Sequence, residues 1–290
     1  MKQSNAIPIL VVVLTLLVIW YGAAIWMNAF WQNQLNERAG LTDVPFLTFA
    51  QQTWAQDKPL LPAPHQVVAE VWKTTAEVAV TSKKSLIYHG WVTLSSTLLG
   101  FVFGTALGIG LAVAIVHNSA SDRSLMPWVI ASQTIPILAI APMVIVVLNA
   151  VGISGLVPKA LISTYLSFFP IVVGMVKGFR SPEQIQLDLM HTYNASSWQT
   201  FWKLRWPAAL PYLFTSMKVG VAASLVGAIV AELPTGAAGG YGARLLAGSY
   251  YGQTIQIWSA LVMAAVTAAL LVILVEVAER MATARMGART

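Results

Sequence analysis

The chain has 290 residues, of which 57% are hydrophobic and only 10% are charged, against about 25% charged in ordinary soluble domains. It contains no cysteine, which excludes disulfides and thiolate metal sites. The net charge of +6 would suit nucleic-acid binding, but the placement of the basic residues matters more than their sum. The composition predicts a membrane protein.

Six apolar segments are each long enough to cross the hydrocarbon, which takes about 20 residues of helix. A helix satisfies its own backbone hydrogen bonds, as lipid requires. The sequence therefore predicts an all-α polytopic membrane protein with about six transmembrane helices. The predicted spans are residues 7–27, 92–116, 125–150, 156–176, 210–231 and 257–278.

The first apolar segment has a second interpretation. Lys2 precedes the apolar run, as in a cleavable signal peptide. The run is longer than a signal peptide needs, and bulky Trp and Met residues crowd its end. These features favour a retained transmembrane helix.

Basic residues are concentrated in alternate connecting segments. With the amino terminus inside, the two short external loops hold only Lys159 and Arg244, whereas the internal segments hold most of the other basic residues. The long segment 30–88 is mixed in charge, and long loops obey the positive-inside rule least. The asymmetry predicts a multi-pass protein of the bacterial inner (plasma) membrane with both termini in the cytoplasm.

The predicted organisation follows from these spans. Residues 1–29 form the amino-terminal helix, 30–90 a periplasmic segment, 91–280 the core membrane domain and 281–290 a cytoplasmic tail. Four prolines punctuate the stretch 30–64, so an external loop without a large core is expected there. Residues 65–80 fit an amphipathic helix at the outer membrane surface and equally an ordinary helix packed on the loop.

Glycines recur every fourth residue in the second span, at Gly100, Gly104 and Gly108. Small residues at this spacing let helices approach closely in lipid. Packing within one subunit is favoured over a dimer interface, because any polytopic bundle needs such faces.

The third span carries two prolines, Pro136 and Pro142. Proline removes a backbone hydrogen bond and kinks a helix. Gln133 and Thr134 precede the first kink, where their side chains would either line a translocation pathway or bond the freed carbonyls. Gln133, Thr134 and Pro136 are therefore candidate pathway residues.

Glu232 ends the fifth span, before an external loop rich in glycine and flexible enough for a gate. An ionisable group in a membrane helix is a functional candidate by default. Glu232 is thus a candidate gate residue; the alternative is an ion pair with Arg244 that anchors the loop.

A polar stretch at 180–208 interrupts the apolar helices. Residues 182–193 read as a short helix that opens with Pro182 and Glu183, good first-turn residues. Asn194 follows and tolerates the left-handed conformation that ends helices. A second short helix would run over 195–205 and end at Pro207.

This second helix carries Trp198, Phe201 and Trp202 at helical spacing. Burial against the membrane helices is favoured for these aromatic side chains, with contact to a partner protein as the alternative.

The polar stretch resembles the cytoplasmic coupling loop of type I ABC importer permeases. That pattern is Glu-Ala-Ala, three residues, Gly, nine residues, Ile, one residue, Leu-Pro. It falls on Asp188, Leu189 and Met190, then Asn194, and then Leu204, Trp206 and Pro207. The spacing holds throughout, whereas several letters differ.

Segments from 61 to 280 are similar, in order, to the nitrate/sulfonate/taurine group of these permeases. They include QTIPILAIAP at 133–142, FFPIVVGMVKGFRS at 168–181 and VGAIVAE at 226–232.

The resemblance implies the type I importer permease fold with a two-helix coupling loop. It implies a pathway formed with a second permease subunit as a homodimer, a periplasmic solute-binding protein and a cytoplasmic ABC ATPase dimer. The residues implied to couple to the ATPase are Asp188, Leu189, Met190, Asn194, Ala195, Ser196 and Pro207.

The chain has no GxxxxGK[ST] phosphate loop, so no enzymatic activity and no bound cofactor are expected in it. ATP and Mg²⁺ would bind at the partner ATPase. The implied solute is small, either nitrate-, sulfonate- or taurine-like or a pyrimidine-type compound, and the sequence does not choose among them.

Two other classes of function compete with the importer subunit. A membrane enzyme would need clustered catalytic groups, but His65, His89, His117 and His191 are scattered along the chain. An ion-coupled secondary transporter usually carries mid-membrane ionisable groups or broken inverted repeats. Neither feature is evident, so the secondary transporter remains the alternative to the importer subunit.

Overall fold

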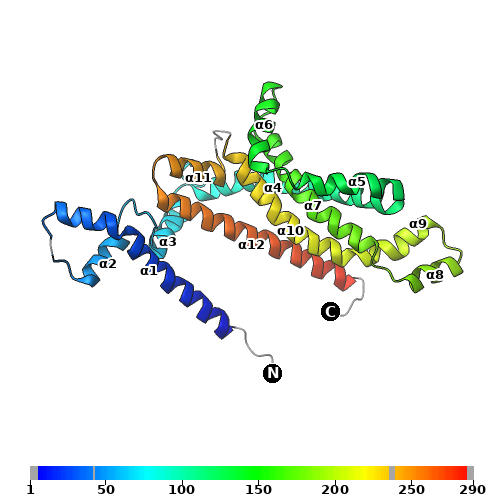
Figure 1. Cartoon of the computed structure of the whole chain (residues 1–290), viewed down its shortest axis with the longest axis horizontal. Coiled ribbons are helices and arrows are strands. Elements are labelled where there is room, and N and C mark those ends of the chain that lie inside the picture. Colours follow the sequence, from blue (N-terminus) through cyan, green and yellow to red (C-terminus); the bar gives the residue numbers. More distant parts are fainter. Residues whose placement is uncertain (1–5, 42, 235–238, 286–290) are drawn as a thin grey trace. The chain divides into compact units, whose positions relative to one another are not determined.

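The computed structural model describes residues 6–41, 43–234 and 239–285. Over these ranges every regular element is a helix (Figure 1). The chain divides into two compact units. Unit 1 comprises residues 1–89 and 244–263, and unit 2 comprises residues 90–243 and 264–290.

Among the described residues, five helices are long and apolar enough to cross a membrane, and a bent pair of helices would make a sixth span. The predicted all-α polytopic fold is confirmed. The elements, in chain order, are α1 Ala6–Arg38, α2 Phe46–Trp54, α3 Pro64–Trp72, the π-turn η1 Lys73–Glu77, α4 Leu86–His117, α5 Ser119–Ser132, α6 Ile137–Ala150, α7 Leu156–Phe179, α8 Gln184–Thr192, α9 Ser197–Thr200, the π-turn η2 Phe201–Arg205, α10 Trp206–Glu232, α11 Tyr241–Tyr250 and α12 Thr254–Arg285.

The third predicted span is not one kinked helix. It is the bent pair, in which α5 and α6 meet at 96° across residues 133–136. Pro136 caps α6 with an extended conformation, and proline also excludes the helical conformation from the residue before it. Pro142, by contrast, lies inside α6, so only the first proline breaks the span.

In unit 1, the prediction of an external loop over residues 30–64 is wrong. The first helix continues as far as Arg38, and α2 forms a second helix that packs against it. The sequence misled because three amide side chains of α1, at Asn28, Gln32 and Asn36, are buried there. Buried amides that bond one another replace the apolar core that was expected to mark a folded segment.

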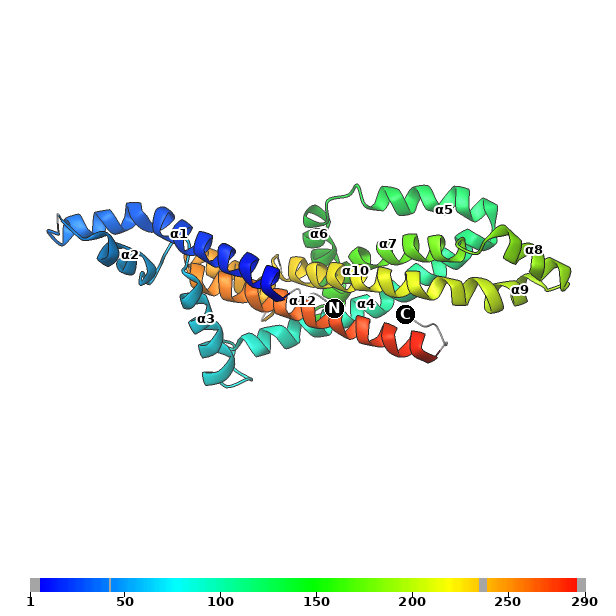
Figure 2. The ribbon, with the colours of Figure 1, turned by 90° about the horizontal axis from the view of Figure 1, so that it is seen from below.

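Unit 2 is built around α7 and α10, which run side by side (Figure 2). Gly100, Gly104 and Gly108 of α4 face α7, where an added Cβ would overlap Ser163, Ser167 and Ile171. The hydroxyl of Thr164 also donates to the Gly100 carbonyl, at 3.2 Å. Close packing within one subunit, as predicted from the glycine spacing, is confirmed.

Enlarging Gly104 is expected to destabilise unit 2. Gly104→Val places a side chain against Ser167, and overpacking of this kind costs about 1–3 kcal/mol. The matched control is Gly110→Val in the same helix, because a Cβ there meets nothing within 4 Å. Thermal unfolding in detergent should show a lower midpoint for Gly104→Val alone. Equal midpoints for the two variants would contradict the packing described here.

Candidate functional site

The first half of the polar stretch is the short helix α8. Its backbone begins with a reciprocal cap, in which the Glu183 N–H donates to Gln186 Oε1 at 3.0 Å. In the first turn of the helix, Gln184 Nε2 donates to Asp188 Oδ1 at 2.9 Å. The bond joins two side chains four residues apart on the exposed face of α8, and such pairs stabilise a helix.

Asn194 makes the turn that ends α8. Its φ is +50°, and within the described ranges it is the only non-glycine residue with a positive φ. The Asn194 N–H donates to the His191 carbonyl at 2.8 Å, and the Ala195 N–H donates to the Met190 carbonyl at 3.0 Å. These two bonds define a Schellman motif, and the predicted left-handed turn is confirmed.

The second half of the stretch begins at a capping box. Ser196 Oγ accepts from the Gln199 N–H at 3.3 Å, while Gln199 Oε1 accepts from the Ser196 N–H at 2.9 Å. From Ser197 the backbone stays helical through α9 and η2 into α10. Figure 2 shows α8 and α9 together at one end of unit 2.

The prediction that Pro207 ends this helix is wrong. Pro207 lies in the first turn of α10, directly after the π-turn η2. Proline lacks an N–H and its ring crowds the carbonyl four residues earlier. The wider π-turn accommodates it, as such bulges do, so the helix from Ser197 reaches Glu232 without a stop.

The aromatic residues of the second helix divide between core and surface. Phe201 is 3% exposed and packs against Phe179, with ring centroids 5.2 Å apart. Trp198, which is 66% exposed, lies edge-on to Trp202 at 5.5 Å. Burial was correct for Phe201, whereas Trp198 remains on the surface of the chain.

Two arginines fasten the polar stretch to the membrane helices. Arg205 Nη1 donates to the Phe179 carbonyl at 2.9 Å, at the end of α7. Arg180 Nη2 pairs with Asp122 Oδ2 of α5 at 2.7 Å. The base of the stretch is thus fixed on two sides while its outer face is open.

The outer face of the polar stretch exposes both polar and large apolar side chains. Asp188, Asn194 and Ser196 are exposed, whereas Met190 and Ala195 are half-buried. The exposed large hydrophobic side chains of the stretch are Ile185, Leu189, Tyr193, Trp198 and Trp202. The structure therefore brings the predicted coupling residues 188–196 together in one exposed protrusion. We call this protrusion, residues 184–205, the knob.

The break between α5 and α6 shows how freed carbonyls are satisfied. Thr134 Oγ1 donates to the Ala131 carbonyl at 2.8 Å, and the Tyr165 hydroxyl of α7 donates to the Ser132 carbonyl. Gln133 and Thr134 are exposed on this chain, so repair of the backbone and exposure coexist. No local pattern predicts the role of Tyr165, because it lies 33 residues beyond Ser132 in the chain.

The end of α10 holds a buried carboxylate. Glu232 is 0% exposed. Thr93 Oγ1 of α4 lies 3.0 Å from both Glu232 oxygens, and the Gly242 N–H of α11 donates to Oε2 at 2.9 Å. Lys159 Nζ of α7 lies 3.8 Å from Oε1. Four helices therefore meet at one carboxylate, and we call these four residues the carboxylate hub.

Further bonds extend the carboxylate hub. The Tyr241 N–H donates to Thr93 Oγ1 at 2.9 Å, and the Tyr241 hydroxyl lies 3.0 Å from Thr267 Oγ1 of α12. A Cβ on Gly240 would overlap the Glu232 carboxyl group, and its φ of +117° also favours glycine. Residues 240–242 are therefore packed and hydrogen-bonded against the carboxylate hub.

The predicted alternative for Glu232, a pair with Arg244, is wrong. Glu232 pairs with Lys159, whereas in unit 1 Arg244 Nη2 lies 4.0 Å from Glu70 Oε1. Burial lowers the pKa of Arg244, and the Glu70 carboxylate opposes that shift. Lys159, predicted to lie in a short external loop, instead belongs to α7. Nothing in the sequence shows that α7 begins beside the end of α10.

The chain is similar in sequence to several curated proteins over much of its length. It is 30% identical over 180 residues to the riboflavin transport system permease protein RibX of Chloroflexus aurantiacus, covering 62% of this chain and 63% of that protein. It is 30% identical to the formylaminopyrimidine transport permease protein ThiX of Halalkalibacterium halodurans, over 60% of this chain and 65% of that protein. For these two relatives, less than two thirds of the relative's length is matched.

A more distant relative is matched over more of its length. The putative aliphatic sulfonates transport permease protein SsuC of Bacillus subtilis is 24% identical, over 74% of this chain and 78% of that protein. Among solved structures, an inward-facing MetNI methionine ABC transporter has a TM-score of 0.55 at 20% identity, over 70% of this chain and 96% of that chain. That likeness shows the fold.

The model of one protein family matches residues 104–287, which is more than half of the chain. The matched region contains the exposed knob, the break before α6, and Lys159, Glu232 and Gly242 of the carboxylate hub. The chain belongs to the family described as the inner membrane component of binding-protein-dependent transport systems.

Proposed function

We propose that this chain is the permease subunit of an ATP-driven importer, which forms the translocation pathway for a small solute delivered by a periplasmic binding protein. The single observation that carries the proposal is the knob at 184–205. It is a two-helix loop with a Schellman turn at Asn194 and an exposed outer face, on a helix continuous with a membrane span.

The partners follow from that role. A cytoplasmic ABC ATPase dimer would receive the knob in a groove, with Leu189 and the other exposed apolar side chains as the buried contact. ATP and Mg²⁺ would bind there, and a second copy of this chain would complete the pathway. This arrangement requires the knob and both termini to lie in the cytoplasm, in agreement with the charge asymmetry of the loops.

We assign two roles within unit 2. Gln133 and Thr134, exposed at the break before Pro136, are proposed to line the pathway. Glu232 is proposed to act at the gate by holding the chain beyond α10, since Gly240 and Gly242 lie directly against it. In that role it need not face the solute.

Reconstitution separates the importer subunit from an ion-coupled transporter. Proteoliposomes with this chain, its ATPase and the binding protein are expected to accumulate at least one of riboflavin, uracil, taurine or nitrate only when ATP is supplied. An ATPase variant without its phosphate-loop lysine is the control and should abolish accumulation. Accumulation by this chain alone, driven by an ion gradient, would establish the secondary transporter instead.

A further inference from the structure

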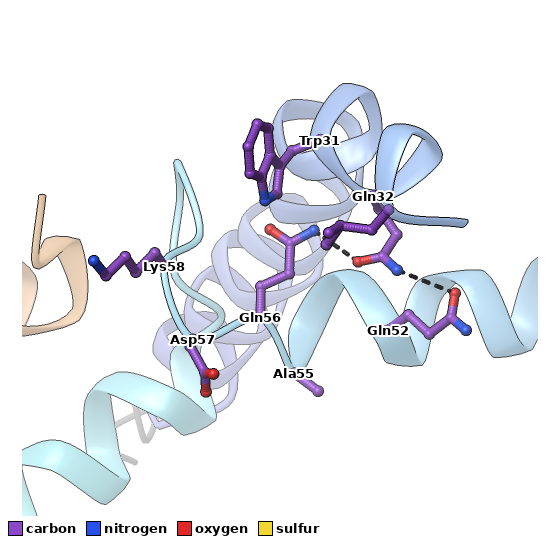
Figure 3. Close-up of a pocket in the computed structure, with 8 residues that line it drawn as sticks. Trp31, Gln32, Gln52, Ala55, Gln56, Asp57 and Lys58 are labelled. Atoms are coloured by element: carbon purple, nitrogen blue, oxygen red, sulfur yellow. Dashed lines mark hydrogen bonds between the residues drawn. The ribbon is translucent and has the colours of Figure 1, made fainter. Parts of the chain in front are cut away.

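Unit 1 contains a groove that the import cycle leaves unexplained (Figure 3). Its volume is about 610 Å³, and its walls come from α1, α2 and the residues just after α2. The groove lies beyond the first predicted span, because the eleven residues 28–38 rise about 16 Å past residue 27. The lining residues are Trp31, Gln32, Leu35, Gln52, Ala55, Gln56, Asp57 and Lys58.

One wall of the groove is a chain of amides with fixed polarity. Gln56 Nε2 donates to Gln32 Oε1 at 2.8 Å, and Gln32 Nε2 donates to Gln52 Oε1 at 3.3 Å. Asn36 Nδ2 donates to the same Gln52 oxygen at 3.1 Å. Since the nitrogens of Gln56, Gln32 and Asn36 each face an acceptor and the Gln52 oxygen accepts two of these bonds, flipping any one of the four amides would lose a bond.

Asn28 makes the groove rigid. Its Oδ1 accepts from the N–H groups of Leu60 and Leu61, at 2.7 and 3.1 Å. Its Nδ2 donates to the Leu61 carbonyl at 2.8 Å. Residues 60 and 61, which follow the groove in the chain, are therefore bonded to α1 through one buried side chain. A preformed wall of this kind lowers the entropic cost of binding.

This polarity leaves one acceptor and one donor for a ligand. Gln56 is 8% exposed, and its Oε1 has no hydrogen-bond partner in the part of the chain that the structure describes. A buried polar atom without a partner costs about 1–3 kcal/mol. Gln52 Oε1 is occupied, so its half-buried Nε2 remains to donate.

Trp31 supplies an aromatic surface beside this acceptor. Its side chain is 50% exposed, and in Figure 3 the Gln56 oxygen points toward the indole. Since the Gln56 oxygen is itself buried, a ligand would reach it only after turning the indole aside. The rim carries one acid and one base, Asp57 and Lys58, both exposed, so the groove offers no net charge to an anion.

We propose that this groove binds a neutral planar heterocycle that carries a ring amide. Its N–H would donate to Gln56 Oε1, its carbonyl would accept from Gln52 Nε2, and its face would stack on Trp31. A sugar hydroxyl both donates and accepts, so it would not need the fixed polarity of the amide chain. The proposal rests on the proposed import function, because it names the class of solute that reaches the outer side of the permease.

Equilibrium dialysis of the full chain in lipid nanodiscs tests the site without ATPase or ATP. Radiolabelled uracil is expected to be retained, and 1,3-dimethyluracil, which has no N–H, should bind at least tenfold more weakly. Trp31→Ala should weaken uracil binding about tenfold or more, as loss of one stacking side chain does. Trp26→Ala is the matched control, since Trp26 is 80% exposed on the same helix and does not line the groove, and it should change nothing.

Three outcomes would overturn the proposal: no retention of uracil, equal retention of uracil and its dimethyl derivative, or retention of nitrate or sucrose as tight as that of uracil. Equal effects of Trp31→Ala and Trp26→Ala would also do so. Because the measurement omits nucleotide, its failure would leave the ATP dependence of uptake intact. Conversely, binding that persists without any ATP-driven uptake would contradict the proposed function and not the groove.

Discussion

Replacing Glu232 with alanine is expected to give the largest loss of stability of any single substitution in unit 2. The variant leaves Lys159, which is 7% exposed, without its carboxylate and removes the acceptor for Thr93 and the Gly242 N–H. Breaking a buried ion pair by removing one partner costs about 3–5 kcal/mol. The check is the thermal unfolding midpoint in detergent, together with the yield of folded protein in the membrane.

A neutral pair tests whether charge is the cause. Glu232→Gln with Lys159→Met keeps an acceptor at 232 and removes both buried charges, so it should recover most of the lost stability. Arg280→Ala is the matched control, because its pair with Glu276 is exposed and such pairs contribute about 0–1 kcal/mol. If Glu232→Ala proves no less stable than Arg280→Ala, the carboxylate hub does not hold unit 2 together.

Asn194→Pro is expected to uncouple ATP hydrolysis from this chain while leaving it in the membrane. Proline fixes a negative φ, which is incompatible with the φ of +50° at this position, and it removes the N–H that donates to His191. The knob would then lose its angle, whereas the spans would be untouched. ATPase stimulation by the binding protein should fall about tenfold or more, since a misplaced contact costs at least that much.

Two further variants of the knob test the same explanation, one expected to retain ATPase stimulation and one expected to lose it. Asn194→Gly should retain stimulation, because glycine adopts a positive φ without strain. Asp188→Lys should reduce stimulation, because it removes the acceptor for Gln184 and reverses the charge of the exposed face. Stimulation that is normal in Asn194→Pro would show that the turn does not position the contact with the ATPase.

The knob could be predicted from sequence because its signals are local. A turn former at 194 follows a short polar helix, and the backbone bonds that define the turn lie within the six residues 190–195. The glycines of α4 were equally readable, since spacing alone places Gly100, Gly104 and Gly108 on one face of a helix. Both features depend on residues close together in the chain.

The features that sequence reasoning missed depend on residues far apart. The pair of Lys159 with Glu232 joins the start of one helix to the end of another, and Tyr165 of α7 donates to a carbonyl at the break before α6. The helical hairpin of α1 and α2 is not predictable from the sequence pattern for a different reason. Amides fill its interior, so its burial pattern is polar and looks like that of an exposed loop.

The unbroken helix from Ser197 to Glu232 has a mechanical consequence. Its 36 residues make a rod about 54 Å long, with the knob at one end and the carboxylate hub at the other. A tilt of about 5° imposed at the knob sweeps the far end through about 5 Å, nearly one helical turn. A rigid helix of this length would convert a small change of angle at the knob into a displacement of several ångströms at the carboxylate hub.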